Sequence, residues 1–328
     1  MSAPWQLVGI AAATVARTAT RRILRGPLRP SWPWRTELVA ATTRAILMQS
    51  KTRGPRWLRD ALDAAPTPRP FLRRVRTRDV EAAGVRGRWF EPLDGGAAER
   101  AIVYFHGGGF VIGWADTHAE VMARLAVAAR ARVLGVEYRL APEHRFPAAH
   151  DDALAATRWV LARDAPGRVA IAGDSAGGNL AVATLCALRD AGETLPAAGV
   201  LLCPWTDPLA AGGSMDANAA FDFGDRSLLS GWIGDYAPGD TAQDPRVRVV
   251  DARLDGLPPL LVQVGGAEIL LDQVRAFAER ARRAGVAVRL DEWPDMFHDW
   301  QLQAALLPEG ARAVEGIARF LEEAWRAA

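Results

Sequence analysis

The chain has 328 residues, of which 50% are hydrophobic and 24% charged, and 40 basic against 38 acidic side chains give a formal net charge of +2. These values are ordinary for a globular protein and exclude disordered and fibrous classes, and the interspersed charges provide no surface for nucleic acid. The two cysteines, Cys186 and Cys203, lie in apolar segments. A disulfide framework is therefore not expected, and both are predicted to be buried thiols.

Residues 1–70 carry helical patterns that are rich in tryptophan and interrupted by Pro27, Pro30, Pro33, Pro55 and Pro66. Short, interrupted helices are not stable alone, so we predict an N-terminal helical cap that packs on a larger body. The apolar run at 7–15 is too short to span a membrane, and its arginines follow it. Neither a signal peptide nor an integral membrane span is expected, and a cytoplasmic location is predicted from these missing signals. Contact of this segment with a membrane surface is left open.

From residue 73 onward the pattern changes to strands that alternate with helices. Two short strands are predicted at 75–80 and 85–90, and further strands at 101–105, 133–138, 169–172, 200–203, 260–264 and 286–293, of which 101–105 and 169–172 are apolar without alternation. Helices are expected from about 148, 175, 271 and 308. This alternation predicts an α/β fold with about eight strands, mostly parallel and flanked by helices, whose first two strands are antiparallel at one edge. The unit spans 71–328, and an insertion at about 205–250 is predicted to lie with the N-terminal cap over the carboxyl ends of the strands.

A glycine-rich loop, His106-Gly-Gly-Gly-Phe110, follows the predicted strand 101–105. Three consecutive glycines leave backbone N–H groups without side chains in the way, which suits the binding of an anion. A phosphate loop would need a lysine and a serine after the glycines, and residues 110–113 supply neither. His106 is interpreted as a structural group that holds this loop.

The pattern Gly-Asp-Ser-Ala-Gly at 173–177 lies between a predicted strand and a predicted helix. The glycines allow a tight turn that holds Ser175 at its tip, with the N–H of Ala176 at the helix N-terminus beside it. This context favours a nucleophile. The alternative is a glycine-rich helix N-cap in which Ser175 only satisfies backbone donors.

A nucleophilic serine needs a base, and the base needs a carboxylate to orient it. His298 follows the last predicted strand and completes the chain order serine, acid, histidine of α/β-hydrolases. The earlier His118, His144 and His150 are interpreted as surface or packing residues. The loop after 260–264 offers two acids, Glu268 and Asp272, of which Asp272 could instead serve the first turn of the next helix.

Together these segments resemble the hormone-sensitive lipase family of esterases, in its bacterial branch. The matching pieces are the HGGG motif at 106–110, Tyr-Arg-Leu-Ala-Pro-Glu-His-Arg-Phe-Pro-Ala at 138–148, the GDSAGG motif at 173–178, and the tail at 265–300. The resemblance covers about 84–328. It implies an α/β-hydrolase fold with an N-terminal helical cap, and ester hydrolysis without cofactor or metal. It also implies an oxyanion hole made by the N–H groups of Gly108, Gly109 and Ala176.

One departure concerns the acid. Family members usually read Asp-Pro-Leu-x-Asp where this chain has Glu268-Ile-Leu-Leu-Asp272, and the first Asp of that motif is the acid of the triad. The match places Glu268 at the catalytic position, and its separation from His298 suits the family spacing. Asp272 stays as the alternative.

The sequence therefore predicts a serine carboxylesterase for short- to medium-chain esters, with Ser175, His298 and Glu268 as catalytic triad. Activity should rise with pH through about 6–7, where the imidazole becomes neutral. Lactone or amide hydrolysis by the same triad is an alternative. A non-catalytic ligand-binding member of the fold is disfavoured because His298 is present. The expected partner is a small ester, and a homodimer is left open.

Overall fold

The computed structural model describes residues 3–63, 68–95, 99–114 and 116–328. Eight strands form one sheet in the order β1-β2-β4-β3-β5-β6-β7-β8. Their bounds are β1 Val75–Ala82, β2 Val85–Pro92, β3 Ala101–Phe105, β4 Arg132–Val136, β5 Val169–Asp174, β6 Ala198–Leu202, β7 Leu260–Gly265 and β8 Val288–Trp293. β1 and β2 pair antiparallel, β2 joins β4 antiparallel, and all other pairs are parallel. The predicted mostly parallel sheet with its antiparallel edge is confirmed.

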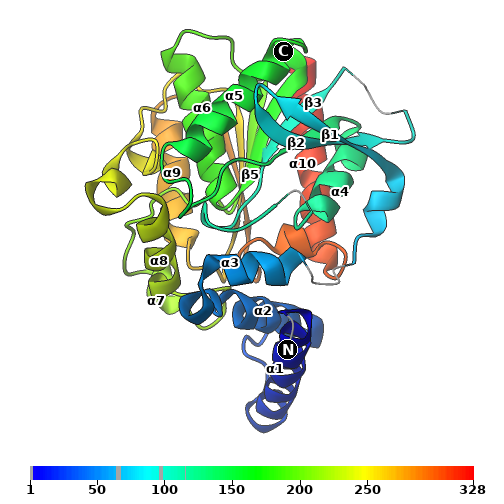
Figure 1. Cartoon of the computed structure of the whole chain (residues 1–328), viewed down its shortest axis with the longest axis vertical. Coiled ribbons are helices and arrows are strands. Elements are labelled where there is room, and N and C mark those ends of the chain that lie inside the picture. The colour runs from blue at the N-terminus through cyan, green and yellow to red at the C-terminus, as the bar shows by residue number, and fades with distance from the viewer. Residues whose placement is uncertain (1–2, 64–67, 96–98, 115) are drawn as a thin grey trace.

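Helices cover both faces of this sheet (Figure 1). α4 (Ala119–Ala129) and α10 (Pro308–Ala327) pack on one face, and α5 (Ala148–Leu161), α6 (Ala176–Asp190) and α9 (Leu271–Arg283) on the other. Central strands such as β3 and β5 are buried on both faces, which explains their unbroken apolar runs. The sequence did not predict α4. Most of its side chains are buried, so it lacks the polar face that marks an amphipathic helix.

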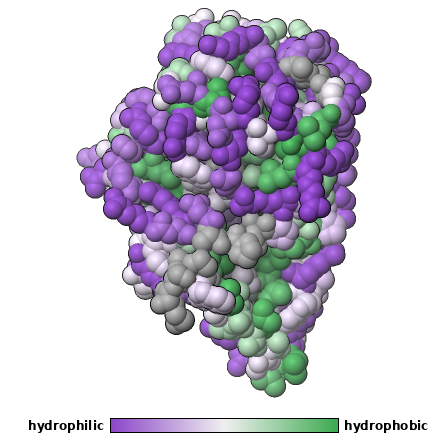
Figure 2. Space-filling model, turned by 45° about the vertical axis from the view of Figure 1, so that its right-hand side comes forward, coloured by the Kyte–Doolittle hydropathy of each residue, from purple (hydrophilic) through white to green (hydrophobic). Residues whose placement is uncertain are grey.

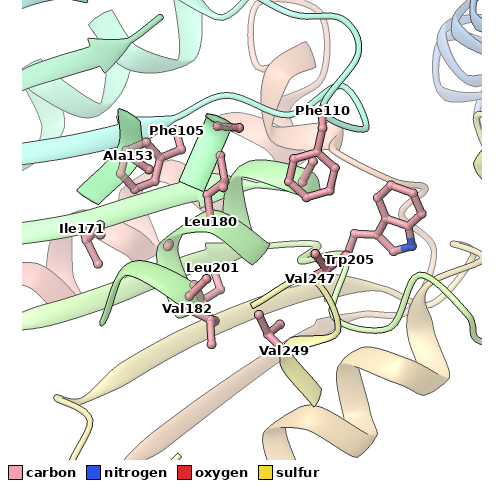
Figure 3. Packing of buried hydrophobic residues seen from close by; sticks show 14 of the residues in the cluster. Phe105, Phe110, Ala153, Ile171, Leu180, Val182, Leu201, Trp205, Val247 and Val249 are labelled. Atoms are coloured by element: carbon pink, nitrogen blue, oxygen red, sulfur yellow. The ribbon is translucent and has the colours of Figure 1, made fainter. Parts of the chain in front are cut away.

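The largest of the three hydrophobic cores among the described residues joins the sheet to the segment after β6. Figure 3 shows Phe105 and Ile171 of the central strands packed near Leu180 of α6, with Trp205 and Val249 of the following segment beside them. The same segment contains α7 (Ser214–Ala217) and α8 (Arg226–Tyr236). The apolar residues of this segment thus form part of the largest core, and the segment packs against the sheet domain.

Three N-terminal helices lie beyond the carboxyl ends of the strands: α1 (Ala3–Arg25), α2 (Trp34–Leu47) and α3 (Ser50–Asp63) (Figure 1). α3 and α8 meet where the Trp232 indole N–H donates to the Ser50 hydroxyl at 3.1 Å. The Arg44 guanidinium donates to the carbonyls of Asp222 and Gly224. The N-terminal helices are therefore bound to the 205–250 segment as well as to the sheet domain.

Short 3₁₀ turns complete the described chain at Pro70–Arg74, Pro166–Arg168, Gly239–Gln243, Val249–Asp251 and Trp300–Gln303. Both cysteines are free and buried, as predicted. Among the helices that the structure describes, none combines the length and apolarity needed to cross a bilayer.

Candidate active site

Ser175 stands in a strained turn between β5 and α6. Its backbone has φ 52° and ψ −116°, a conformation that costs free energy for a residue with a Cβ. The turn closes tightly, because a Cβ on Gly177 would lie 2.0 Å from the Phe105 carbonyl oxygen and one on Gly173 would lie 2.3 Å from the Gly177 carbonyl oxygen. The Ser175 side chain makes no capping hydrogen bond to α6. The N-cap alternative is therefore not supported.

The structure brings Glu268, and not Asp272, to the histidine. Glu268 Oε2 lies 2.8 Å from His298 Nδ1, and Glu268 Oε1 accepts a hydrogen bond from the Gly265 N–H at 2.8 Å. Glu268 is fully buried and His298 is 6% exposed. The Asp272 side chain is instead more than half exposed and accepts from the Ser214 N–H. A carboxylate on Nδ1 fixes the tautomer that leaves Nε2 as the acceptor.

The other ring nitrogen of His298 contacts a second carboxyl group. His298 Nε2 lies 3.1 Å from Asp299 Oδ2. Among the described residues, Ser175 Oγ has no hydrogen-bond partner, so the serine and the imidazole are not joined directly. Ser175, His298 and Asp299 nevertheless line one cavity of about 230 Å³. Asp299 was not identified from the sequence, where only its position next to His298 could have drawn attention to it.

Buried carboxyl groups surround the imidazole and control its charge. Burial opposes protonation of His298, but the Asp299 carboxylate, the Cys203 thiol and Glu268 together raise the pKa of His298 well above its ordinary value. Burial raises the pKa of Asp299 to about 7, against the opposing effect of His298. The site thus holds more carboxyl groups than cationic groups. The His298 imidazole and the Asp299 carboxyl group therefore compete for a proton near neutral pH.

Asp222 ties the acid loop to the histidine loop. It comes from the 205–250 segment, is fully buried, and accepts from the backbone N–H groups of Phe223, Ile269 and His298 at 2.7–2.8 Å. Burial, together with the charge of Glu268, raises the pKa of Asp222 to about 6. Asp222 was not predicted from the sequence. Its partners are main-chain groups, and no side-chain motif marks them.

Asp174, next to Ser175, holds the glycine-rich loop. Its carboxylate accepts from the Gly107 N–H at 2.9 Å and the Tyr104 hydroxyl at 2.7 Å, and lies 3.2 Å from His118 Nε2. Burial opposes the charge of Asp174, yet His118 and Tyr104 lower the pKa of this carboxyl below its ordinary value. His118 is therefore a buried partner of Asp174, which is more specific than the surface or packing role expected.

His106 has the structural role that the sequence suggested. Its Nδ1 lies 2.8 Å from the Gly107 carbonyl oxygen, and its ring stacks on Tyr138 at 4.2 Å. The Tyr138 hydroxyl donates to the His106 carbonyl. Burial lowers the pKa of His106 to about 3, so the ring is neutral. A neutral, fixed ring at the start of the loop positions the glycines without adding charge.

The glycines at the centre of the loop leave backbone donors available. Gly108 and Gly109 have φ values of 114° and 61°, and a Cβ on Gly109 would lie 2.3 Å from the Trp232 ring. Of the hydrogen bonds among the described residues, none uses the N–H groups of Gly108, Gly109 or Ala176. These are the donors that the sequence analysis named.

Cys203 lies beside Glu268 and His298, and these three form one group whose potential metal-ligand atoms lie within 4.8 Å of one another. Burial, followed by the charge of Glu268, raises the pKa of the Cys203 thiol well above its ordinary value. A metal ligand must be a thiolate. The ligand atoms of Glu268 and His298 are also already joined by a hydrogen bond, so this group fits a carboxylate–imidazole pair with a neutral thiol neighbour better than a metal site.

Known proteins are similar to this chain in sequence over most of its length. Residues 102–302 match the family model of the alpha/beta hydrolase fold. An acetyl-hydrolase from Streptomyces hygroscopicus is 44% identical over 75% of this chain and 83% of its own length. An esterase from Acinetobacter venetianus is 36% identical over 81% of this chain and 88% of its own length.

Solved structures agree in fold. An esterase from the bacterial hormone-sensitive lipase family superimposes with a TM-score of 0.77 at 38% identity, covering 97% of this chain and 98% of that one. A hyperthermophilic esterase from the archaeon Pyrobaculum calidifontis superimposes with a TM-score of 0.78 at 31% identity, covering 85% and 96% of the two chains. The chain therefore belongs to the hormone-sensitive lipase family of α/β-hydrolases and is a carboxylic ester hydrolase.

Proposed function

We propose that Ser175 is the nucleophile of this hydrolase, His298 its general base and acid, and Glu268 the group that orients His298. The observation that carries the proposal is the 2.8 Å contact between Glu268 Oε2 and His298 Nδ1 in a histidine that shares one cavity with Ser175. The N–H groups of Gly108, Gly109 and Ala176 are the proposed donors to the oxyanion.

In the proposed reaction, Ser175 Oγ attacks the ester carbonyl carbon and its proton passes to His298 Nε2. The imidazolium then gives this proton to the leaving alcohol, and an acyl-enzyme remains on Ser175. Water repeats the sequence: it loses a proton to Nε2, attacks the acyl carbon, and releases the carboxylic acid and the serine hydroxyl.

Asp299 must release Nε2 before this sequence begins. A hydrogen bond from Nε2–H to the carboxylate blocks the position that has to accept the serine proton. Because the Asp299 side chain reaches the cavity and one of its oxygens has no partner among the described residues, rotation of this side chain would free Nε2 without moving the main chain. Apo sites of this kind commonly tighten only when substrate binds.

The cavity favours short to medium acyl chains. Its volume of about 230 Å³ is below the range of about 300–1,000 Å³ of sites for drug-sized ligands. Its walls include Leu47 of α2, Leu62 of α3 and Trp232 of α8. We propose that residues 1–70 and the segment at about 205–250 act together as the cap that limits this volume, over a catalytic domain spanning 71–328.

The test combines a substrate series with variants of the purified full chain. We expect p-nitrophenyl acetate and butyrate to be hydrolysed faster than the laurate ester, and Ser175→Ala and His298→Ala to reduce kcat for the best ester by at least about 10³-fold. Thr43→Val, which changes a cavity-lining side chain with no proposed role, is the matched control. Ser175→Ala with wild-type turnover would refute the assigned nucleophile, and faster hydrolysis of the laurate would refute the proposed acyl range.

A further inference from the structure

Helix α1 presents its large apolar side chains to solvent. Trp5, Val8, Val15 and Ile23 are spaced by three to eight residues so that they fall on one face of the helix, and Ala12, Ala16 and Ala19 fill the positions between them. Trp5 is 68%, Val8 52% and Ile23 84% exposed. A surface helix of a globular protein normally turns such a face toward the core.

The side of α1 that faces the protein is the less apolar one. Its buried residues are Leu7, Thr14 and Thr18, and the α1–α2 contact is fastened by ion pairs from Arg21 and Arg22 to the buried Glu37. The N-terminal helices therefore pack against the more polar side of α1, and its apolar face has no partner among the described residues. Aliphatic side chains on that face gain nothing from folding.

Other large apolar side chains are exposed at and near the end of the helix, to the side of this face. Leu24 is 74% exposed, and the half-exposed Trp34 lies beside α1, with the Arg22 guanidinium 5.9 Å from its ring centre. Figure 2 shows hydrophobic surface gathered at the lower end of the molecule, and Figure 1 shows α1 projecting there from the body. We call this surface, formed by Trp5, Val8, Val15, Ile23, Leu24 and Trp34, the α1 face.

The charge around the α1 face identifies the partner. The first acidic residue of the chain is Glu37, whereas residues 1–36 hold the arginines Arg17, Arg21, Arg22, Arg25, Arg29 and Arg35. Among the described residues, Arg17, Arg25 and Arg35 form no ion pair. A second copy of this chain would bring arginine against arginine. An apolar helix face in a segment whose charged side chains are all arginines, with an end tryptophan, instead matches an anionic lipid surface, on which arginine side chains reach the headgroups.

We propose that the α1 face docks on an anionic lipid surface, with α1 lying in the plane of the interface. A groove of about 710 Å³ lies between α1 and α2, and its lining residues include Trp5 and Asp222. Residues of α2 and α3 also line the active-site cavity. Docking therefore places lipid next to the cap end of the molecule. The contact is a property of the surface and does not depend on the catalytic roles proposed above.

Co-sedimentation of the full chain with vesicles tests the docking. One vesicle is phosphatidylcholine alone, and the other is an equal mixture of phosphatidylcholine and phosphatidylglycerol. We expect binding to the anionic vesicle, little binding to the neutral one, and a fall of binding with added salt. The double variant Val8→Ser/Ile23→Ser should bind the anionic vesicle about tenfold or more weakly. Arg17→Gln/Arg25→Gln should lose part of the preference for the anionic vesicle.

The matched control is Leu93→Ser/Leu209→Ser, which removes two exposed leucines that lie outside the α1 face and should leave vesicle binding unchanged. All variants should hydrolyse a soluble p-nitrophenyl ester at the wild-type rate, which verifies folding. Wild-type chain that binds neither vesicle would overturn the proposal, as would undiminished binding by Val8→Ser/Ile23→Ser. Loss of a dimer in that variant, measured by light scattering without any change in vesicle binding, would assign the face to a second copy and also overturn it.

Discussion

The substitution Glu268→Gln isolates the role of the carboxylate at almost constant shape. In the wild type, Oε1 accepts from the Gly265 N–H and Oε2 lies 2.8 Å from His298 Nδ1. A glutamine has only one oxygen for these two positions. If its oxygen stays on the Gly265 N–H, its amide N–H₂ faces Nδ1 and can bond only to an Nδ1 that carries no proton.

That arrangement selects the tautomer with the proton on Nε2, which cannot accept the proton of Ser175. The opposite orientation would set the amide N–H₂ against the buried Gly265 N–H, at a cost of about 1–3 kcal/mol for an unsatisfied buried donor. Loss of the useful tautomer reduces kcat by about 10⁴-fold in a serine protease triad, which corresponds to about 5.5 kcal/mol of barrier. We expect a loss of about 10³- to 10⁴-fold here.

The assay is steady-state hydrolysis of p-nitrophenyl butyrate at a pH above the acidic limb, with kcat and KM separated. KM should change little, because Glu268 is not among the residues that line the cavity. Asp272→Asn is the matched control: it alters the other acid of the same loop, which is more than half exposed and accepts from Ser214 instead of contacting His298, and should retain activity within about threefold. Glu268→Gln with more than a tenth of wild-type kcat, or an equal loss in Asp272→Asn, would refute the reasoning.

Three further outcomes are expected. Asp299→Asn removes one of the charges that raise the pKa of His298, so the acidic limb of kcat/KM against pH should move to lower pH. Asparagine also tolerates the left-handed backbone of this residue, with φ 54°. An unmoved limb would exclude Asp299 as the partner of His298 Nε2. Asp222→Asn leaves one backbone N–H facing an amide donor, so kcat should fall by about 10- to 100-fold with KM little changed. Asp216→Asn, on the exposed surface of the same segment, should leave kcat unchanged. Equal activities of the two variants would show that Asp222 does not hold the two loops in position. Trp232→Ala enlarges the cavity, and the rate of octanoate relative to acetate hydrolysis should rise by about tenfold; an unchanged ratio would show that Trp232 does not limit chain length.

The pH expectation from the sequence changes with the structure. The ordinary pKa of a histidine predicts a rising limb of activity at about pH 6–7. Since the pKa of His298 is raised well above its ordinary value and the proposed base works only when neutral, the limb should lie at higher pH. The sequence could not supply this correction, because the charge of Asp299 matters only once its side chain is placed at Nε2.

The sheet was predictable because each strand carries a local signal. Mostly apolar runs at β3 to β7 mark strands buried on both faces, and the chain order of strands and helices fixes a parallel sheet. α4 was not predicted because a helix that is buried on most sides has no polar face, and so lacks the periodic pattern that indicates a helix. Ser175 and His298 were proposed as site residues from the motifs and chain order that surround them, and the structure places both in one cavity.

The remaining site residues depend on distances in three dimensions. Sequence left Glu268 and Asp272 in competition, and only the 2.8 Å contact separates them. Asp222 joins two loops by accepting main-chain N–H groups, which any residue type provides, so its partners carry no signal. The same holds for the exposed face of α1, whose helical period is clear from sequence but whose direction is not.

The central claim, that Ser175 attacks the acyl group, is tested most directly by covalent trapping. The full chain is incubated with a p-nitrophenyl phosphonate ester, and the intact mass and the modified peptide are measured. We expect one phosphonyl group per chain, carried by the peptide that contains Ser175, with loss of esterase activity in proportion and no adduct on Ser175→Ala. An adduct at another residue that accompanies inactivation, or a labelled and active Ser175→Ala, would contradict the account.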